Sequence, residues 1–229
     1  MSQPPSFDPR RVGGIVFDLD GTLVDSYEAI ADSLNHARRH FEMPALPVER
    51  VRSSVGHGLE ALVASLLGRE RIDEGVRLFR EHYASIYSAK TFALPGIVTT
   101  LRQLAGRGYT MAVASNKPAR FGEAIVRDLG MSDYLVSVQG PDRVGSTKPE
   151  PTMIRRCLEE MSIDAGRAVY VGDMVLDVET AARAGVPVVL VSGGSSSERD
   201  LRATGQTLLD SFQELLDLLP GRRSASAAV

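Results

Sequence analysis

The sequence predicts an α/β fold, in which helices cover a parallel sheet and an all-helical block is inserted between two of the strands. Two observations lead to this prediction. Short apolar runs alternate with segments of helical spacing over most of the 229 residues, and one long stretch has helical spacing but no strand candidate. Strands that alternate with helices pair in parallel, because each crossover returns the chain to the same edge of the sheet.

Five short apolar runs are the expected strands, and each ends at a polar residue or a glycine. They span 14–17, 109–114, 135–138, 168–171 and 186–191. The segments between them place apolar residues on one helical face, and Gly108 and Gly130 follow where two of these helices would end. The stretch 193–197, Gly-Gly-Ser-Ser-Ser, is expected to be a flexible loop.

Between Ser26 and Phe92, only helical patterns occur. Three apolar faces are expected to pack together: Ala29, Ile30, Leu34 and Ala37; Leu59, Leu62, Val63, Leu66 and Leu67; and Val76, Phe79, Tyr83 and Ile86. We therefore expect a helical cap domain over residues 26–92 and a core made of residues 1–25 and 93–229. The joining stretches 24–26 and 92–96 are candidate hinges, which would let the cap open and close.

Composition excludes several classes of protein. The 26 Lys and Arg residues against 29 Asp and Glu give a formal net charge of −3, which argues against nucleic acid as a partner. Neither a targeting segment nor an apolar run near the roughly 20 residues of a membrane span is recognisable, so no membrane partner is expected. The single Cys157 cannot form an internal disulfide, which favours a reducing compartment, the cytoplasm. Residues 1–11 and 221–229 are expected to be a flexible lead-in and a frayed tail.

Polar residues gather where the expected strands end. Four segments carry them: Asp18-Leu19-Asp20-Gly21-Thr22, Ser115-Asn116-Lys117, Thr147-Lys148-Pro149, and Gly172-Asp173 with Asp177. Ligands of open parallel sheets bind at the carboxyl ends of the strands, so these side chains should form one site. The chain contains only three lysines, and two of them, Lys117 and Lys148, lie in these segments.

The four aspartates of this site favour a bound cation. Asp18, Asp20, Asp173 and Asp177 together carry about four negative charges, and Lys148 offsets only one of them. Oxygen ligands without histidine or cysteine favour Mg²⁺ over zinc, and a calcium loop lacks its Glu at the twelfth position here. Taken singly, an aspartate of this kind could be a helix cap or favour a helix start, and Ser115 or Asn116 could be an N-cap.

Two carboxylates so close in sequence can divide the work of cleaving a phosphate ester. One of Asp18 and Asp20 can attack phosphorus, while the other donates a proton to the leaving oxygen and then activates water. Gly21 permits the turn that this needs, and the Thr22 hydroxyl can hold the acid in place. Neutral donors for phosphoryl oxygens and a compact positive charge are offered by Ser115, Asn116 and Lys148.

In their order along the chain and in their residues, the four segments resemble the motifs of the haloacid dehalogenase superfamily. The resemblance extends from about Gly14 to Gly194. The resemblance implies a Rossmann-like core with a mobile cap inserted after the first motif. It implies that Asp18 is the nucleophile, that Asp20 is the general acid and base, and that Mg²⁺ is held by Asp18, the Asp20 backbone carbonyl and Asp173. It further implies that Asp177 orients the metal shell, that Ser115 and Asn116 bind the phosphoryl group, and that Lys148 neutralises it. An acid at Asp20 is typical of the branches that transfer phosphoryl groups.

Within that superfamily, stretches 14–26, 115–118 and 171–174 are most similar to phosphoglycolate phosphatases, which implies a small phosphorylated metabolite, 2-phosphoglycolate, as the substrate. Thr22, Ser115 and Asn116 are the expected substrate-binding residues of the core. The cap loop 53–58 is similar to a Gly-x-Gly cap loop of that group, and Arg52 or His57 could pair a substrate carboxylate. The alternative interpretation is a surface turn with a solvated histidine.

We therefore predict a Mg²⁺-dependent phosphatase that hydrolyses a small phosphomonoester through an aspartyl-phosphate at Asp18. Two alternatives remain open. A sugar-phosphate mutase of the same superfamily would share every core motif, but would return the phosphoryl group to a second hydroxyl. A non-catalytic phosphometabolite-binding protein would not need both Asp18 and Asp20.

Overall fold

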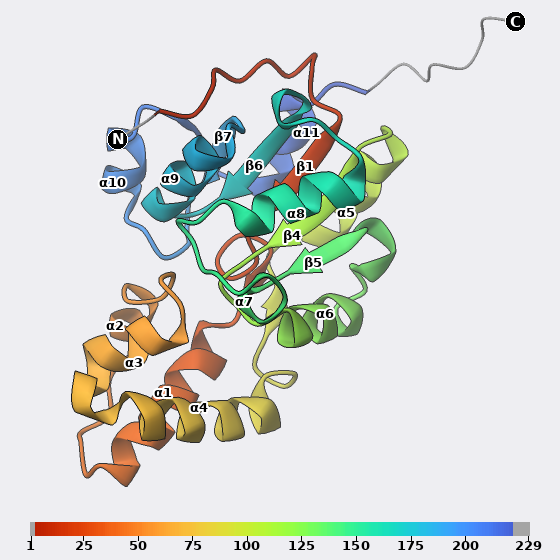
Figure 1. Cartoon of the computed structure of the whole chain (residues 1–229). Coiled ribbons are helices and arrows are strands. Elements are labelled where there is room, and N and C mark those ends of the chain that lie inside the picture. Colours follow the sequence, from red (N-terminus) through yellow and green to blue (C-terminus); the bar gives the residue numbers. More distant parts are fainter. Residues whose placement is uncertain (1–2, 222–229) are drawn as a thin grey trace, which may run out of the picture.

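A six-stranded parallel sheet forms the centre of the core in the computed structural model, which describes residues 3–221 (Figure 1). The strands run in the order β5-β4-β1-β6-β7-β8. Their bounds are Gly14–Phe17 (β1), Thr110–Ala114 (β4), Ser137–Gln139 (β5), Ala168–Gly172 (β6), Val188–Val191 (β7) and Thr207–Leu209 (β8). The five predicted strands and the parallel sheet are confirmed, but β8 was not predicted. β8 lies at the edge of the sheet, where Thr207 is exposed. The strand therefore has no continuous apolar run of the kind that marks a central strand in the sequence.

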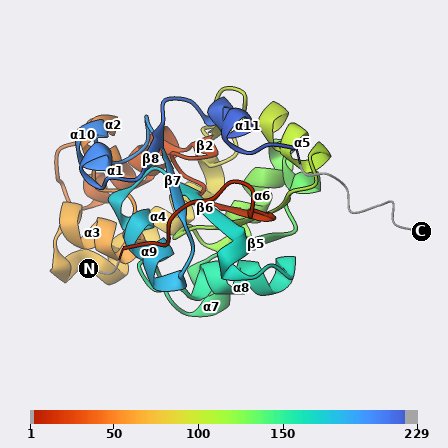
Figure 2. The ribbon, with the colours of Figure 1, turned by 90° about the horizontal axis from the view of Figure 1, so that it is seen from above.

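Helices cover both faces of this sheet. Side chains alternate along β1, so Ile15 and Phe17 belong to one apolar cluster and Val16 to the other. Figure 2 shows α8 and α9 on one side of the sheet, and α5 and α11 on the other. The core helices span Ile97–Gly106 (α5), Ala119–Asp128 (α6), Pro141–Val144 (α7), Thr152–Met161 (α8), Val175–Ala184 (α9), Glu198–Ala203 (α10) and Leu215–Leu218 (α11). Gly108 and Gly130 follow α5 and α6 with φ of +83° and +70°, as expected of glycines at helix ends.

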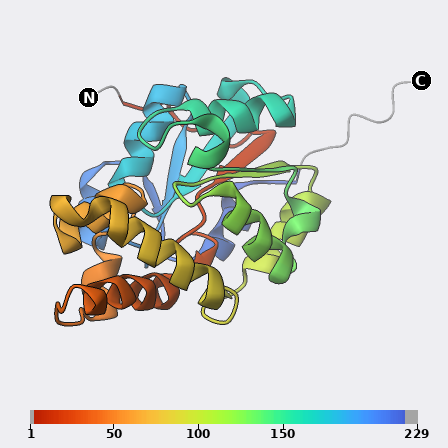
Figure 3. The same ribbon diagram turned by 60° about the horizontal axis from the view of Figure 1, so that its bottom comes forward.

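The helical cap is a separate layer below the carboxyl ends of the strands in Figure 1. It contains Tyr27–His40 (α1), Val48–Arg52 (α2), Leu59–Leu67 (α3) and Ile72–Ile86 (α4). Figure 3 shows α1 and α4 side by side. The three predicted apolar faces meet in one cluster, in which Leu34, Val63 and Leu67 are at most 1% exposed. An α/β core with an inserted all-helical cap is therefore confirmed.

A short antiparallel pair closes the base of the cap. Val24–Asp25 (β2) pairs with Phe92–Ala93 (β3), so the chain enters and leaves the cap at adjacent points. The prediction that residues 26–92 contain no strand is therefore wrong at its last residue, since Phe92 begins β3. Two residues are too few to produce an alternating pattern that could be recognised in the sequence.

The ends of the chain differ in part from the expectation. The expected flexible lead-in is wrong for Phe7, which packs against the core. The predictions for residues 1–2 and for the tail beyond Gly221 lie outside the described residues. Within residues 3–221, no helix combines the length and the apolar character that a membrane span needs.

Candidate active site

Three neighbouring strands deliver the predicted residues to one edge of the sheet. Asp18 follows β1 at the centre, Ser115 follows β4 on one side, and Asp173 follows β6 on the other. The chain builds the sheet outward from β1 in one direction through β4 and β5, and in the other through β6, β7 and β8. Such a reversal opens a crevice at the carboxyl ends of the strands, and that is where ligands bind in open parallel sheets.

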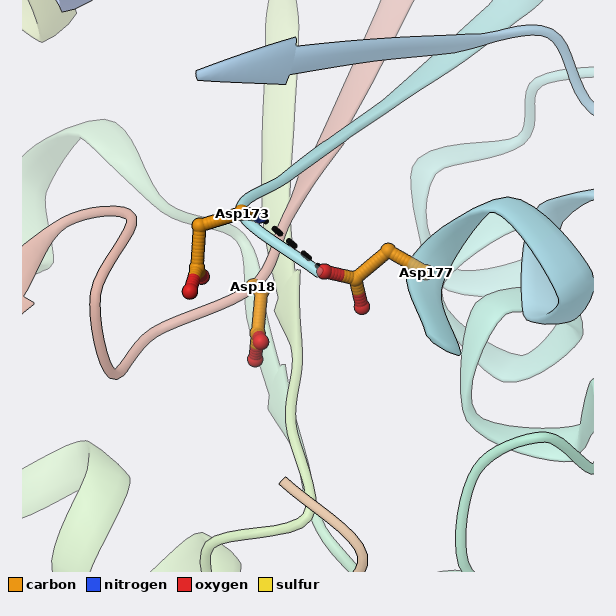
Figure 4. Close-up of side chains that lie close together, drawn as sticks. All are labelled: Asp18, Asp173 and Asp177. Atoms are coloured by element: carbon orange, nitrogen blue, oxygen red, sulfur yellow. Dashed lines mark hydrogen bonds between the residues drawn. The ribbon is translucent and has the colours of Figure 1, made fainter. Parts of the chain in front are cut away.

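Three buried aspartates form the base of this crevice. Carboxylate oxygens of Asp18, Asp173 and Asp177 all lie within 4.8 Å of one another, and Figure 4 shows the three side chains grouped together. Burial, and then the charges of Asp18 and Asp177, raise the pKa of Asp173 well above its ordinary value. A cation at this position would relieve that repulsion. The donor set, oxygen atoms alone, suits a hard divalent ion such as Mg²⁺.

Lys148 lies between two of these acids. Its Nζ is 2.9 Å from Asp18 Oδ2 and 2.8 Å from Asp177 Oδ1. Burial disfavours the ammonium, but the charges of Asp177 and Asp18 outweigh burial and raise the pKa of Lys148. The other oxygen of Asp177 accepts the backbone N–H groups of Asp173 and Met174, at 3.1 and 2.9 Å. Asp177 therefore positions both Lys148 and the loop after β6.

Asp173 is held by two donors from different parts of the core. The Thr22 hydroxyl donates to its Oδ1 at 2.7 Å, and the Ser195 backbone N–H donates to its Oδ2 at 2.7 Å. Gly21, with φ of +84°, makes the turn that brings Thr22 under Asp173. Thr22, predicted as a substrate-binding residue, is 1% exposed and engages this acid in the structure.

Asp20 is held by groups that the sequence did not reveal as partners. The Ser26 hydroxyl donates to its Oδ1 at 2.5 Å, and Lys117 Nζ lies 3.1 Å from its Oδ2. The same ammonium donates to the hydroxyl of Tyr83, on cap helix α4, at 2.8 Å. With Lys117 included, four carboxylates face two ammonium groups, so the excess negative charge is smaller than the sequence suggested.

Asn116 ties the core to the cap. Its side-chain oxygen accepts the Lys148 backbone N–H at 2.8 Å, and its amide nitrogen donates to the carbonyl of Gly56 in the cap loop at 2.6 Å. Ser115, beside it, is 4% exposed, and its hydroxyl accepts the Lys117 backbone N–H at 3.4 Å. These two residues therefore hold the Lys148 loop, the Lys117 loop and the cap loop in register.

A cavity lies between the core and the cap and opens onto these side chains. Its core wall includes Asp18, Asp20, Ser115, Asn116 and Lys117. Its cap wall is mostly apolar and includes Ile30, Leu59, Leu62 and Phe79. A substrate in this cavity would therefore meet the polar groups at one end and apolar side chains at the other.

The structure does not bring Arg52 and His57 to this cavity. Arg52 donates to the carbonyls of Gly193 and Gly194 and lies 4.6 Å from the ring centre of Tyr27. His57 is exposed and faces a different hollow, beside α9. The reason is that the short helix α2 directs Arg52 toward the core loop after β7.

That core loop is fixed rather than flexible, which corrects the expectation for 193–197. The Ser195 hydroxyl lies 2.8 Å from the Tyr27 hydroxyl, and the Ser196 hydroxyl accepts the Val175 backbone N–H at 3.2 Å. The Ser195 backbone N–H reaches Asp173. A Gly/Ser composition indicates flexibility only where such partners are missing.

Comparison with known proteins agrees with this geometry. The family model described as haloacid dehalogenase-like hydrolase matches residues 15–191. The chain belongs to this family. A phosphoglycolate phosphatase of Rhodospirillum rubrum is 36% identical over 216 residues, which cover 90% of each chain. A plasmid-encoded phosphoglycolate phosphatase of Cupriavidus necator is 34% identical and covers 93% of this chain and 96% of its own.

The fold is also found among solved structures. A crystal structure of a predicted phosphatase from Clostridium acetobutylicum superimposes with a TM-score of 0.82 and 25% identity, and covers 89% of this chain and 96% of its own. The family resemblance and the enzyme class predicted from the motifs, a phosphatase, are thereby confirmed.

Proposed function

We propose that this phosphatase hydrolyses a small phosphomonoester, in a reaction that needs Mg²⁺ and passes through an aspartyl-phosphate at Asp18. The observation that carries the proposal is the ion pair between Asp18, which lines the cavity, and Lys148; the two groups are 2.9 Å apart and almost completely buried. The carboxylate is the group that would attack phosphorus, and the neighbouring ammonium lies where it can also offset the charge of the transferred phosphoryl group.

The first step transfers the phosphoryl group to the protein. A carboxylate oxygen of Asp18 attacks phosphorus, and the bond between phosphorus and the ester oxygen breaks. Asp20, which lines the same cavity, donates its proton to the departing oxygen. Lys148 offsets the negative charge of the phosphoryl oxygens, and Ser115 supplies a hydroxyl donor.

The second step regenerates Asp18. Asp20, now ionised, accepts a proton from water while the water oxygen attacks phosphorus. The bond between phosphorus and Asp18 breaks, and inorganic phosphate leaves. The contacts of Ser26 and Lys117 with Asp20 keep that carboxylate beside the cavity between the two steps.

The residues present fit a magnesium ion. Asp18 and Asp173 would hold it together with the backbone carbonyl of Asp20, and the Thr22 and Ser195 contacts fix the orientation of Asp173. When bound, the ion would neutralise the phosphoryl oxygens and the buried acids together. We propose 2-phosphoglycolate as the substrate, which the names of the two relatives above support.

The test is release of inorganic phosphate from a panel of phosphomonoesters that includes 2-phosphoglycolate, with and without Mg²⁺. We expect Mg²⁺-dependent release by the wild-type protein, and a loss of about 10⁴-fold or more in kcat for Asp18→Asn. The exposed Asp217→Asn is the matched control and should behave like wild type. An Asp18→Asn protein that is folded and active would refute the aspartyl-phosphate, whereas isomerisation of a sugar phosphate without phosphate release would indicate a mutase.

A further inference from the structure

Lys117 is a buried cation whose only role in the two hydrolytic steps is to help keep Asp20 beside the cavity. Its side chain is 6% exposed and lines the cavity. Two donors of its ammonium have partners, Asp20 Oδ2 at 3.1 Å and the Tyr83 hydroxyl at 2.8 Å. The third N–H has no hydrogen-bond partner within residues 3–221. A buried donor left in this state favours a ligand that can accept its hydrogen bond.

The position of the Lys117 ammonium beside Asp20 limits which group of the substrate can reach it. The ester oxygen of the substrate must lie within hydrogen-bond reach of Asp20 during cleavage. Because Lys117 Nζ lies 3.1 Å from Asp20, a group on the carbon that carries the ester oxygen would be close to this ammonium. A carboxylate there would receive a charge-assisted hydrogen bond.

The other cations near the cavity are less suited to this task. Arg80 lines it, but its side chain is 45% exposed and its guanidinium is 2.9 Å from Glu60. Lys148 lies between Asp18 and Asp177 and acts on the transferred phosphoryl group in the proposed steps. Arg52 binds the carbonyls of the loop after β7.

The apolar cap wall strengthens an interaction at Lys117. Ile30, Leu62 and Phe79 face the same cavity and are at most 7% exposed. Water is displaced from such a wall when the cavity is filled, and a charge pair is stronger where water is excluded.

We infer that Lys117, held in place by Tyr83, is the specificity-determining residue for a carboxylate on the carbon that bears the phosphate, so that the substrate class is the α-phosphooxy carboxylates. The inference rests on the proposed function and names the residue that recognises the substrate. Lys117 takes the place of Arg52 and His57, which the sequence suggested for the same carboxylate.

The experiment compares 2-phosphoglycolate with ethyl phosphate, in which a methyl group replaces the carboxylate. We expect Lys117→Met to lower the ratio of the two kcat/KM values by about 10- to 100-fold, since the lost interaction is a hydrogen bond to a charged group. Lys117→Gln keeps neutral donors for Asp20 and Tyr83, and should lower the ratio as well if Lys117→Met does not fold. Arg80→Met, which removes the other cation of the cavity wall, should leave the ratio within about twofold of wild type.

A binding measurement separates recognition from turnover. In an Asp18→Asn background, calorimetry with 2-phosphoglycolate should show about 10- to 100-fold weaker binding once Lys117→Met is added, and little change for ethyl phosphate. The assignment of Lys117 would be overturned if the ratio of the two kcat/KM values stayed unchanged in Lys117→Met and Lys117→Gln. It would also be overturned if the ratio fell in Arg80→Met instead. Failure of the wild-type protein to release phosphate from any ester of the panel would refute the proposed function, and the calorimetry would still report on Lys117.

Discussion

The backbone N–H of Ser195 donates a 2.7 Å hydrogen bond to the carboxylate of Asp173, across 22 residues of sequence. This bond makes the loop after β7 part of the acidic site. Gly194 lies just before it, and a Cβ at that position would come within 2.0 Å of Asp173 Oδ2. The loop can therefore approach the acid only with a glycine there.

Gly194→Ala should displace either this loop or Asp173. We expect a loss of about 1–3 kcal/mol in the free energy of unfolding, as for other overpacked sites, together with weaker Mg²⁺ binding. Urea unfolding and Mg²⁺ titration are the measurements. Gly106→Ala is the matched control, because a Cβ there meets no atom within 4 Å, and it should be neutral or slightly stabilising.

Thr22→Val should weaken Mg²⁺ binding without disturbing the fold. The change keeps the shape of a side chain that is 1% exposed but removes the hydroxyl that donates to Asp173. Residues that orient metal ligands commonly affect metal affinity by about 10- to 100-fold, so the half-saturating Mg²⁺ concentration should rise by about tenfold. If KM for the substrate rose instead at saturating Mg²⁺, the sequence-based assignment of Thr22 to substrate binding would be favoured.

Arg52→Met should act through the loop after β7. The variant loses the hydrogen bonds to the Gly193 and Gly194 carbonyls, which hold the loop whose next N–H supports Asp173. We expect the half-saturating Mg²⁺ concentration to rise about 2- to 5-fold, as suits partly exposed hydrogen bonds. The preference for 2-phosphoglycolate over ethyl phosphate should not change, and a lost preference would make Arg52 the carboxylate-binding residue.

The cap should lose stability in mild acid through His82. Burial lowers the pKa of His82 below its ordinary 6.5, and His36, stacked on it at 4.5 Å, adds to this effect. The folded protein thus favours the neutral ring, so stability declines as the pH falls below about 6.5. In thermal unfolding at about pH 7.5 and pH 5.5, His82→Gln should show a smaller decrease in Tm than wild type. The exposed His57→Gln should follow wild type.

The core of the site was predictable because its residues directly follow buried strands. Asp18 and Ser115 directly follow β1 and β4, buried strands of four and five residues, and the parallel sheet brings such ends together whatever lies between them. The local order of residues therefore contained most of the information needed to assemble them.

Contacts across the cap and the core could not be predicted in this way. Tyr83 occupies a place on the apolar face of α4 that a packing residue would also fill, and its contact with Lys117 exists only because the two parts dock. The scarcity of lysine and its place after Ser115-Asn116 were the only signals for Lys117. For Arg52, the sequence shows a basic residue near glycines, but not which loop faces it.

The short β2–β3 pair brings the two ends of the cap segment together, so that this segment is a self-contained insertion in the chain. Val24 is paired with Ala93 and Asp25 with Phe92, and paired residues of antiparallel strands lie only about 5 Å apart. A tight turn could therefore join Asp25 to Phe92 in place of the cap, and β2 and β3 would still pair. Helices of another length or sequence could be exchanged at this junction without shifting the register of β1 against its neighbours. The strands that carry the aspartates would keep their register while a new cap changed which ester reaches them.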